Sequence, residues 1–240
     1  MVWPKADWPK ADWPKAQWPP GSRAATTVGK DHEGRRNPRE LGANYRHLPP
    51  VVERSDSTMT IALKALIEHL RQHALRTDGP FILRSGAASD WYLDARQTTY
   101  SGEGAWLVGR AVLKVLDRRV VGVGGMTMGA DPVAMAVAMA GNARGRRLRG
   151  FSIRKETKAH GAGGRLVGPV ASGDAVAVVE DTVSTGAAVL EAVGVLVDAG
   201  IEVIQVICLV DRSGGAAGRR IGERGIPFEA LLRPADLGVE

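Results

Sequence analysis

Three apolar runs place the strongest limit on how this chain can fold. They cover residues 120–125, 175–181 and 201–211, and each is a nearly continuous stretch of Val, Ile, Ala, Leu and Gly. Strands of this kind are buried on both faces, as in a parallel sheet with helices on both sides. Further strands are predicted at 81–86, 91–96, 151–155 and 226–232, and helices at 61–70, 103–118, 131–142 and from the 184–186 loop to Asp198.

The composition is that of an ordinary globular protein. Of the 240 residues, 44% are hydrophobic and 24% are charged, which predicts one domain or two small ones. The net charge of +6 is split evenly between residues 1–58 and the rest, so it argues only weakly for nucleic-acid binding. No apolar run is long enough to span a bilayer, no secretory h-region is visible, and Cys208 has no second cysteine to pair with. We expect a cytoplasmic protein that binds neither membranes nor nucleic acids.

Residues 1–58 differ from the remainder of the chain. They open with a five-residue repeat, WPKAD, that places Trp at positions 3, 8, 13 and 18. The Pro in each unit prevents a continuous helix, and a period of five matches neither a helix nor a strand. We expect a disordered, low-complexity extension, with an aromatic docking segment or a start codon assigned too early as alternatives. The domain is predicted to span 59–240, beginning at Met59.

The segment 175–192 carries the clearest chemical pattern. A buried strand ends in Glu180 and Asp181, a loop with three hydroxyl side chains follows, and a helix begins after Gly186. Loop amides and a helix N-terminus together bind phosphate well. The loop lacks the Lys of nucleotide triphosphatases and the spacing of dinucleotide-binding glycines. A ribose 5-phosphate fits the pattern, since the acids can accept the ribose hydroxyls while the amides bind the phosphate. The alternative is an ordinary capped strand–loop–helix.

A second chemical pattern is the cationic segment RKETKAHGAGG at 154–164. Two of the four lysines beyond residue 58 occur here, in a stretch too rich in Gly for a stable helix. A loop of this kind could close over a pyrophosphate, exclude water and neutralise charge on the leaving group. A solvated basic hairpin is the alternative.

These segments carry a family resemblance. VVEDTVSTGAA resembles the phosphoribosyl-pyrophosphate (PRPP) signature of type I phosphoribosyltransferases, and RKETKAHG resembles the catalytic loop of the orotate phosphoribosyltransferases within that group. FILRSGAASDWYLDAR and CLVDRSGG are similar to two other segments of that family. The resemblance covers 60–235. It implies a type I phosphoribosyltransferase fold, in which a five-stranded parallel sheet is flanked by helices and a small N-terminal hood covers the site.

The resemblance also implies a reaction and its participants. Ribose 5-phosphate would pass from PRPP to orotate, giving orotidine 5′-phosphate and pyrophosphate in pyrimidine biosynthesis. Mg²⁺ would be held mainly by PRPP oxygens, with no direct protein ligand. A homodimer with shared active sites is expected. The alternatives are a purine or uracil phosphoribosyltransferase, and a PRPP-sensing nucleic-acid regulator supported only by the basic residues at 144–155.

The resemblance assigns roles residue by residue. Catalytic roles fall to Arg154, Lys155, Lys158, His160 and Asp181. Contacts with orotate fall to Tyr92, Leu93, Ser184 and Arg212, the last through its guanidinium fork on the carboxylate. PRPP binding is assigned to Arg84, Arg154, Lys155, Lys158, His160, Glu180, Asp181, Thr182, Val183, Ser184, Thr185, Gly186, Ala187 and Ala188.

One segment departs from the family pattern. Many orotate enzymes carry a lysine in the loop that corresponds to GGMTMGAD, whereas this chain has Met128. Loop amides between Gly125 and Gly129 could still bind pyrophosphate as an anion nest.

Overall fold

The computed structural model of the chain describes residues 56–82, 86, 88–156 and 164–240. Nearly all of the predicted extension therefore lies outside the described residues, as do Arg84, Lys158 and His160. The first described helix, α1 (Asp56–His73), begins three residues before Met59. No helix within the described ranges is long and apolar enough to cross a membrane.

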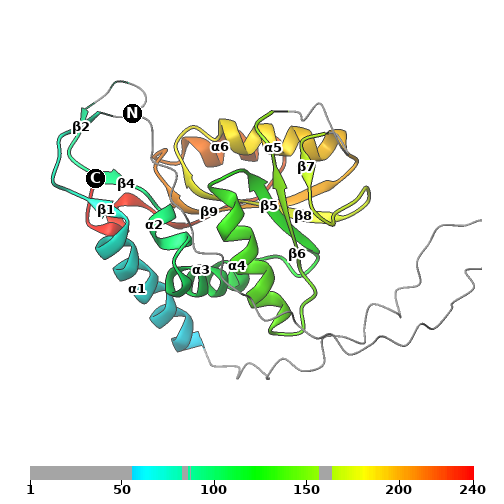
Figure 1. The fold of residues 1–240 in the computed structure, drawn as a ribbon. Coiled ribbons are helices and arrows are strands. Elements are labelled where there is room, and N and C mark those ends of the chain that lie inside the picture. The colour runs from blue at the N-terminus through cyan, green and yellow to red at the C-terminus, as the bar shows by residue number, and fades with distance from the viewer. Residues whose placement is uncertain (1–55, 83–85, 87, 157–163) are drawn as a thin grey trace, which may run out of the picture. The chain divides into compact units, whose positions relative to one another are not determined.

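A six-stranded sheet forms the centre of the fold (Figure 1). The predicted five parallel strands are present, and a short sixth strand runs antiparallel to its neighbour at one edge. That edge strand follows the cationic loop and was not predicted, since two residues carry no readable periodicity. In spatial order the strands are β10 (Phe228–Leu232), β9 (Glu202–Asp211), β8 (Ala175–Val183), β5 (Gly122–Met126), β6 (Arg149–Ile153) and β7 (Leu166–Val167).

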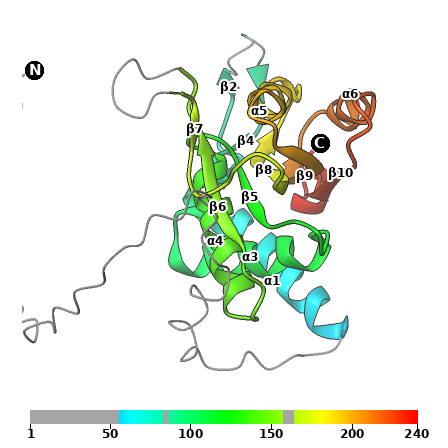
Figure 2. The same ribbon diagram turned by 90° about the vertical axis from the view of Figure 1, so that its right-hand side faces the viewer.

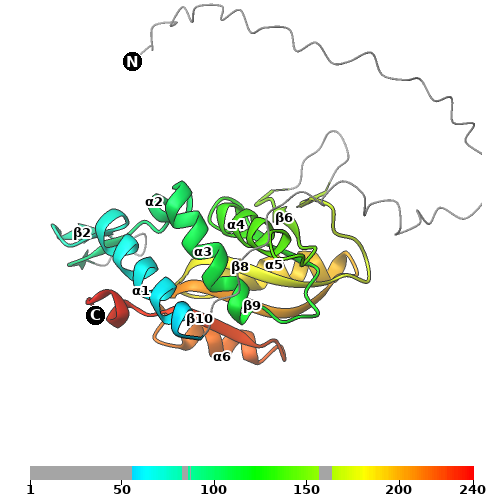
Figure 3. The same cartoon turned by 90° about the horizontal axis from the view of Figure 1, so that it is seen from below.

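Helices cover both faces of the sheet, as the apolar strands predict (Figures 2 and 3). Side chains alternate along β8, so that Ala177 and Val179 join one buried cluster while Val176 and Val178 join the other. The first cluster is formed with α1, α3 (Gly102–Val115) and α4 (Ala130–Asn142). The second is formed with α5 (Ala187–Asp198) and α6 (Ala216–Gly222).

A small hood of short elements precedes the sheet in sequence. Strand β1 (Leu75–Arg76) pairs with β4 (Tyr92–Leu93), and β2 (Phe81–Ile82) pairs with β3 (Ala88–Ser89). The predicted strand at 91–96 is therefore too long, and the one at 81–86 does not extend to Gly86, with 83–85 lying outside the described residues. The strand at 91–96 ends early because Asp94 accepts N–H groups of the next residues and starts α2 (Arg96–Thr99). A 3-10 helix, η2 (Pro234–Leu237), contacts α1 through backbone carbonyls that accept from Arg71.

Candidate active site

The acidic pair lies near the carboxyl end of β8, as predicted. Glu180 and Asp181 are only 8% and 9% exposed. The amide of Asp181 donates to Glu180 Oε1 at 3.1 Å, and the amide of Thr182 donates to Asp181 Oδ1 at 2.6 Å. These local hydrogen bonds fix both carboxylates at the strand end, where the sheet opens.

The environment of the pair disfavours two full negative charges. Burial, together with the neighbouring charge of Asp181, raises the pKa of Glu180 to about 8. Burial also raises the pKa of Asp181, while hydrogen bonds from Thr182 and the positive charge of Arg96 oppose the rise. The pair is therefore ready to accept hydrogen bonds or a positive charge from a ligand, which would compensate the buried carboxylates.

The loop after β8 has the form of a phosphate cradle. Ser184 and Thr185 are exposed, and Gly186 adopts a left-handed conformation with φ of +75° just before α5. A Cβ at Gly186 would meet Ala217 at an ordinary van der Waals distance, so it is the left-handed backbone conformation that favours glycine here. Ala187 and Ala188 are exposed in the first turn of α5, whereas the side chain of Val183 is buried in the second core cluster. The side chain of Val183 is therefore not available to a ligand.

The glycine loop after β5 lies directly against the acidic pair. A Cβ added to Gly129 would come within 3 Å of carboxylate oxygens of both Glu180 and Asp181, so only glycine fits. Met128, at the place of the usual family lysine, is 57% exposed, and its peptide bond with Thr127 is cis. The close approach places the amides of this loop beside the acids.

Asp131 is a further acid of this region that sequence reasoning missed. It lies in the first turn of α4 and accepts hydrogen bonds from Thr127 Oγ1 at 2.7 Å and Ser152 Oγ at 2.6 Å. Its charge also contributes to the raised pKa of Glu180. The sequence feature that could have identified Asp131 as a site residue is its position directly after a glycine loop at a strand end. Its hydroxyl partners indicate that it fixes the shape of the loop.

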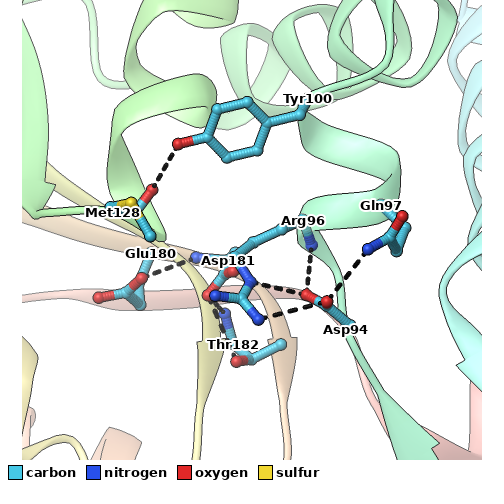
Figure 4. A network of polar contacts seen from close by, with 8 residues as sticks. All are labelled: Asp94, Arg96, Gln97, Tyr100, Met128, Glu180, Asp181 and Thr182. Carbon is cyan, nitrogen blue, oxygen red and sulfur yellow. Dashed lines mark hydrogen bonds and ion pairs between the residues drawn. The ribbon is translucent and has the colours of Figure 1, made fainter. Parts of the chain in front are cut away.

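A second missed residue is Arg96, which Figure 4 shows beside the acidic pair. Its guanidinium pairs with Asp94 at 2.7 Å, and it interacts electrostatically with Asp181. Tyr100, on the same side, donates to the carbonyl of Met128 at 3.5 Å. An open hollow of about 520 Å³ is lined here by Asp94, Arg96, Gln97, Tyr100 and Ser101. No local pattern predicts this arrangement, because α2 reaches the site through the tertiary fold.

Arg212 lies at the end of β9, next to the loop after β8. Its amide donates to the carbonyl of Val183 at 2.7 Å, and the two strands pair as far as Val183 and Asp211. Burial lowers the pKa of its guanidinium. The guanidinium carbon lies 4.7 Å from the centre of the Trp91 ring. Tyr92 is 36% exposed and Leu93 is buried, so the Leu93 side chain belongs to the core and only its backbone could face a ligand.

Arg154 and Lys155, two of the predicted cations of the loop after β6, directly follow β6 in the sequence. The amide of Arg154 donates to the carbonyl of Arg165 at 2.9 Å, and Nε of Arg165 donates to the carbonyl of Arg154 at 2.7 Å. Arg165 in turn forms an ion pair with Glu191 on α5. Lys155 is exposed. The base of the loop is thus tied to α5, the helix that follows the phosphate cradle.

Comparisons with known proteins decide the family. No family model matches the chain. The orotate phosphoribosyltransferase of Streptomyces avermitilis is 43% identical over 177 residues, which cover 73% of this chain and 97% of that protein. This chain belongs to the orotate phosphoribosyltransferase family. Two crystal structures of the Mycobacterium tuberculosis enzyme agree, one with Fe(III) dicitrate (TM-score 0.66, 36% identity) and one with PRPP (TM-score 0.63, 33% identity). Each covers 74% of this chain and 99% of the other.

The family membership confirms the predicted type I phosphoribosyltransferase fold and the resemblance on which it rested. The individual residue roles remain predictions. Within this orotate phosphoribosyltransferase chain, the structure brings Glu180, Asp181, the cradle loop and Arg212 to one edge of the sheet. Lys158, His160 and Arg84 lie outside the described residues.

Proposed function

We propose that this chain transfers ribose 5-phosphate from PRPP to orotate, releasing pyrophosphate and forming orotidine 5′-phosphate in pyrimidine biosynthesis. One observation carries the proposal. The neighbouring strands β8 and β9 end side by side, one in an acidic pair with a hydroxyl-rich loop and the other in Arg212. A sugar phosphate and a carboxylate-bearing base can therefore be bound next to each other.

The residues after β8 bind the sugar phosphate in this proposal. The segment from Thr182 to Ala188 binds the 5′-phosphate through the amides of the loop and of the first turn of α5, together with the hydroxyls of Ser184 and Thr185. Glu180 and Asp181 accept hydrogen bonds from the ribose hydroxyls. As the bond between C1 and pyrophosphate breaks, positive charge develops on the ribose, and the charge of Asp181 stabilises it.

The base is bound by the other strand end. Arg212 donates in a fork to the carboxylate of orotate, and Ser184 contacts the same base. Tyr92 covers the pyrimidine ring with its exposed side chain, while Leu93 contributes its backbone. This arrangement presents a ring nitrogen of orotate to the ribose carbon.

The loop after β6 stabilises the leaving group. Arg154 and Lys155 are at its base, and Lys158 and His160 follow in the sequence. Their charge neutralises the departing pyrophosphate, with Lys158 as the main contributor. Arg84 approaches the same group from the hood.

Magnesium fits this site as a partner of the substrate. The donors that converge at the site are carboxylate and hydroxyl oxygens, which suit a hard cation. PRPP oxygens would hold the ion, with Glu180 and Asp181 ordering the ribose hydroxyls that share it. When bound, Mg²⁺ supplies positive charge to the pyrophosphate.

The surroundings of the site complete the proposal. We infer a cytoplasmic homodimer in which the loop after β6 serves the neighbouring active site, and a catalytic domain spanning 59–240.

The alternative of a nucleic-acid-binding regulator is weakened, because two arginines of the basic run make contacts within the domain. Arg146 donates to the carbonyls of Leu116 and Val120, and Arg149 pairs with Asp174 at 2.7 Å. These arginines serve internal contacts.

A panel of bases tests the proposed function. The full-length protein is incubated with PRPP, Mg²⁺ and either orotate, uracil, adenine or hypoxanthine, and pyrophosphate release is measured. We expect release with orotate and at least 100-fold less with the other three bases. Equal release with uracil, or release only with a purine, would contradict the assignment.

A further inference from the structure

The feature that carries a further inference is the stacking of Arg212 on Trp91. The guanidinium carbon lies 4.7 Å from the ring centre, a distance typical of a cation–π contact. Among the described residues, no carboxylate forms an ion pair with Arg212. Its neighbour Asp211 instead accepts the amide of Ser213 at 2.8 Å. The aromatic ring is thus the contact that orients this cation within the described part of the chain.

Trp91 is held through both its ring and its backbone. Its indole Nε1 donates to the carbonyl of Glu240 at 2.7 Å, a contact spanning 149 residues of sequence. Its backbone carbonyl accepts from Ser89 Oγ at 2.7 Å in the hood. Part of the side chain also packs against the first core cluster. The indole is therefore a partly buried platform between the hood and the segment after η2.

A stacked guanidinium has a defined set of free donors. The guanidinium carbon lies over the indole ring, so the N–H groups that do not face the ring remain available to a ligand. A planar carboxylate binds the edge of a guanidinium in a two-point fork. An arginine without this platform would sample many rotamers and lose that freedom when the ligand binds. Stacking therefore preorganises the fork before orotate arrives.

We propose that Trp91 is a positioning residue for orotate, which orients the Arg212 guanidinium and so sets the affinity for the carboxylate of the base. The proposal rests on the proposed function, since it assumes that Arg212 binds orotate. Trp91 acts through Arg212 and needs no contact with the substrate. The segment that ends at Glu240 contributes by holding the indole.

The chain contains a matched control for this contact. On α3, the guanidinium carbon of Arg110 lies 4.5 Å from the ring centre of Trp106, four residues earlier. Trp106 is 59% exposed and is assigned no role in the site. A substitution there removes an equivalent tryptophan–arginine contact from a helix surface.

The test compares steady-state kinetics of full-length Trp91→Leu, Trp91→Met, Trp91→Phe and Trp106→Leu. For Trp91→Leu and Trp91→Met we expect the KM for orotate to rise about tenfold, with the KM for PRPP and kcat within twofold of wild type. Trp91→Phe keeps an aromatic face and should stay within threefold. Trp106→Leu should leave every constant unchanged. If one of the aliphatic variants is insoluble, the other and Trp91→Phe still provide the comparison.

The outcomes separate this proposal from the proposed function. Orotate KM values for Trp91→Leu and Trp91→Met that match Trp106→Leu would overturn the role of Trp91, provided that Arg212→Ala still raises the constant. If Arg212→Ala also has no effect, the assignment of Arg212 itself fails. The double variant Trp91→Leu/Arg212→Ala should be no worse for orotate than Arg212→Ala alone, because Trp91 acts through that arginine. Full additivity of the two effects would contradict the proposal.

Discussion

The two strand ends that meet at the site have opposite electrostatic character. The end of β8 holds two buried carboxylates whose pKa values are raised, with an exposed hydroxyl loop beside them. The end of β9 holds a half-buried guanidinium that rests on an aromatic ring. The first surface suits donors such as ribose hydroxyls, and the second suits an anion such as a carboxylate. The two strand ends therefore suit different groups of the two substrates, the ribose hydroxyls of PRPP at β8 and the carboxylate of orotate at β9.

The largest expected effect concerns the leaving group, which belongs to neither strand end. Lys158→Ala should lower kcat by about 10²–10⁴-fold, the range for losing one donor that stabilises developing charge. The KM for PRPP should change much less, because the charge matters most as pyrophosphate departs. Turnover within twofold of wild type would show that the loop after β6 has no catalytic role.

A substitution of Arg96 tests how the charge beside the acidic pair at the end of β8 affects PRPP binding. Arg96→Gln removes a positive charge that interacts with Asp181, so the KM for PRPP should rise about three- to tenfold. Arg119→Gln is the matched control, since Arg119 pairs with Asp117 through the same two-residue spacing, at 3.0 Å. Equal effects of the two variants on PRPP would mean that Arg96 only stabilises α2.

The raised pKa of Glu180 predicts a specific dependence of stability on pH. A carboxyl whose pKa rises from 4.5 to about 8 on folding stabilises the native state below pH 4.5, and this contribution is lost between pH 4.5 and 8. The shift corresponds to about 3–5 kcal/mol at full ionisation. Between pH 5 and 8.5, Tm should therefore fall by at least about 5 °C more in the wild type than in Glu180→Gln. Parallel Tm curves would show that the buried pair does not titrate in this range.

The smallest expected effect concerns residues 1–58. A chain that starts at Met59 should keep kcat and both KM values within twofold of the full-length protein, since both strand ends lie inside 59–240. The opening repeat has no apolar periodicity that would add to the core. Kinetics and dimer mass of the two forms provide the measurement. A lower Tm by several degrees or a loss of activity would place the Trp–Pro repeats within the functional protein.

The contrast between the two strand ends also explains what the sequence could predict. The acidic pair, the hydroxyl loop and the helix start are contiguous in 175–192, so their order alone places them together. The apolar strands likewise predicted the parallel sheet. Each of these features is local, and local patterns survive in the sequence.

The long-range contacts around the two strand ends could not be predicted in this way. Trp91 contacts Glu240 across 149 residues. Arg96, which interacts with Asp181, is the first residue of α2, whereas the sequence pattern placed it at the end of a strand. Asp131 was missed because its hydroxyl partners, Thr127 and Ser152, come from two separate strand ends. These contacts depend on how the hood and helices pack on the sheet, which no single segment encodes.

The division of the substrates between the two strand ends is tested most directly by binding. The Kd values of PRPP with Mg²⁺ and of orotate are measured separately, by calorimetry, for the wild type, Asp181→Asn and Arg212→Ala. We expect Arg212→Ala to weaken orotate binding about 30-fold or more, with PRPP within threefold, because an unpaired buried carboxylate is costly. Asp181→Asn should show the reverse preference. Equal weakening of both ligands in both variants would contradict the account.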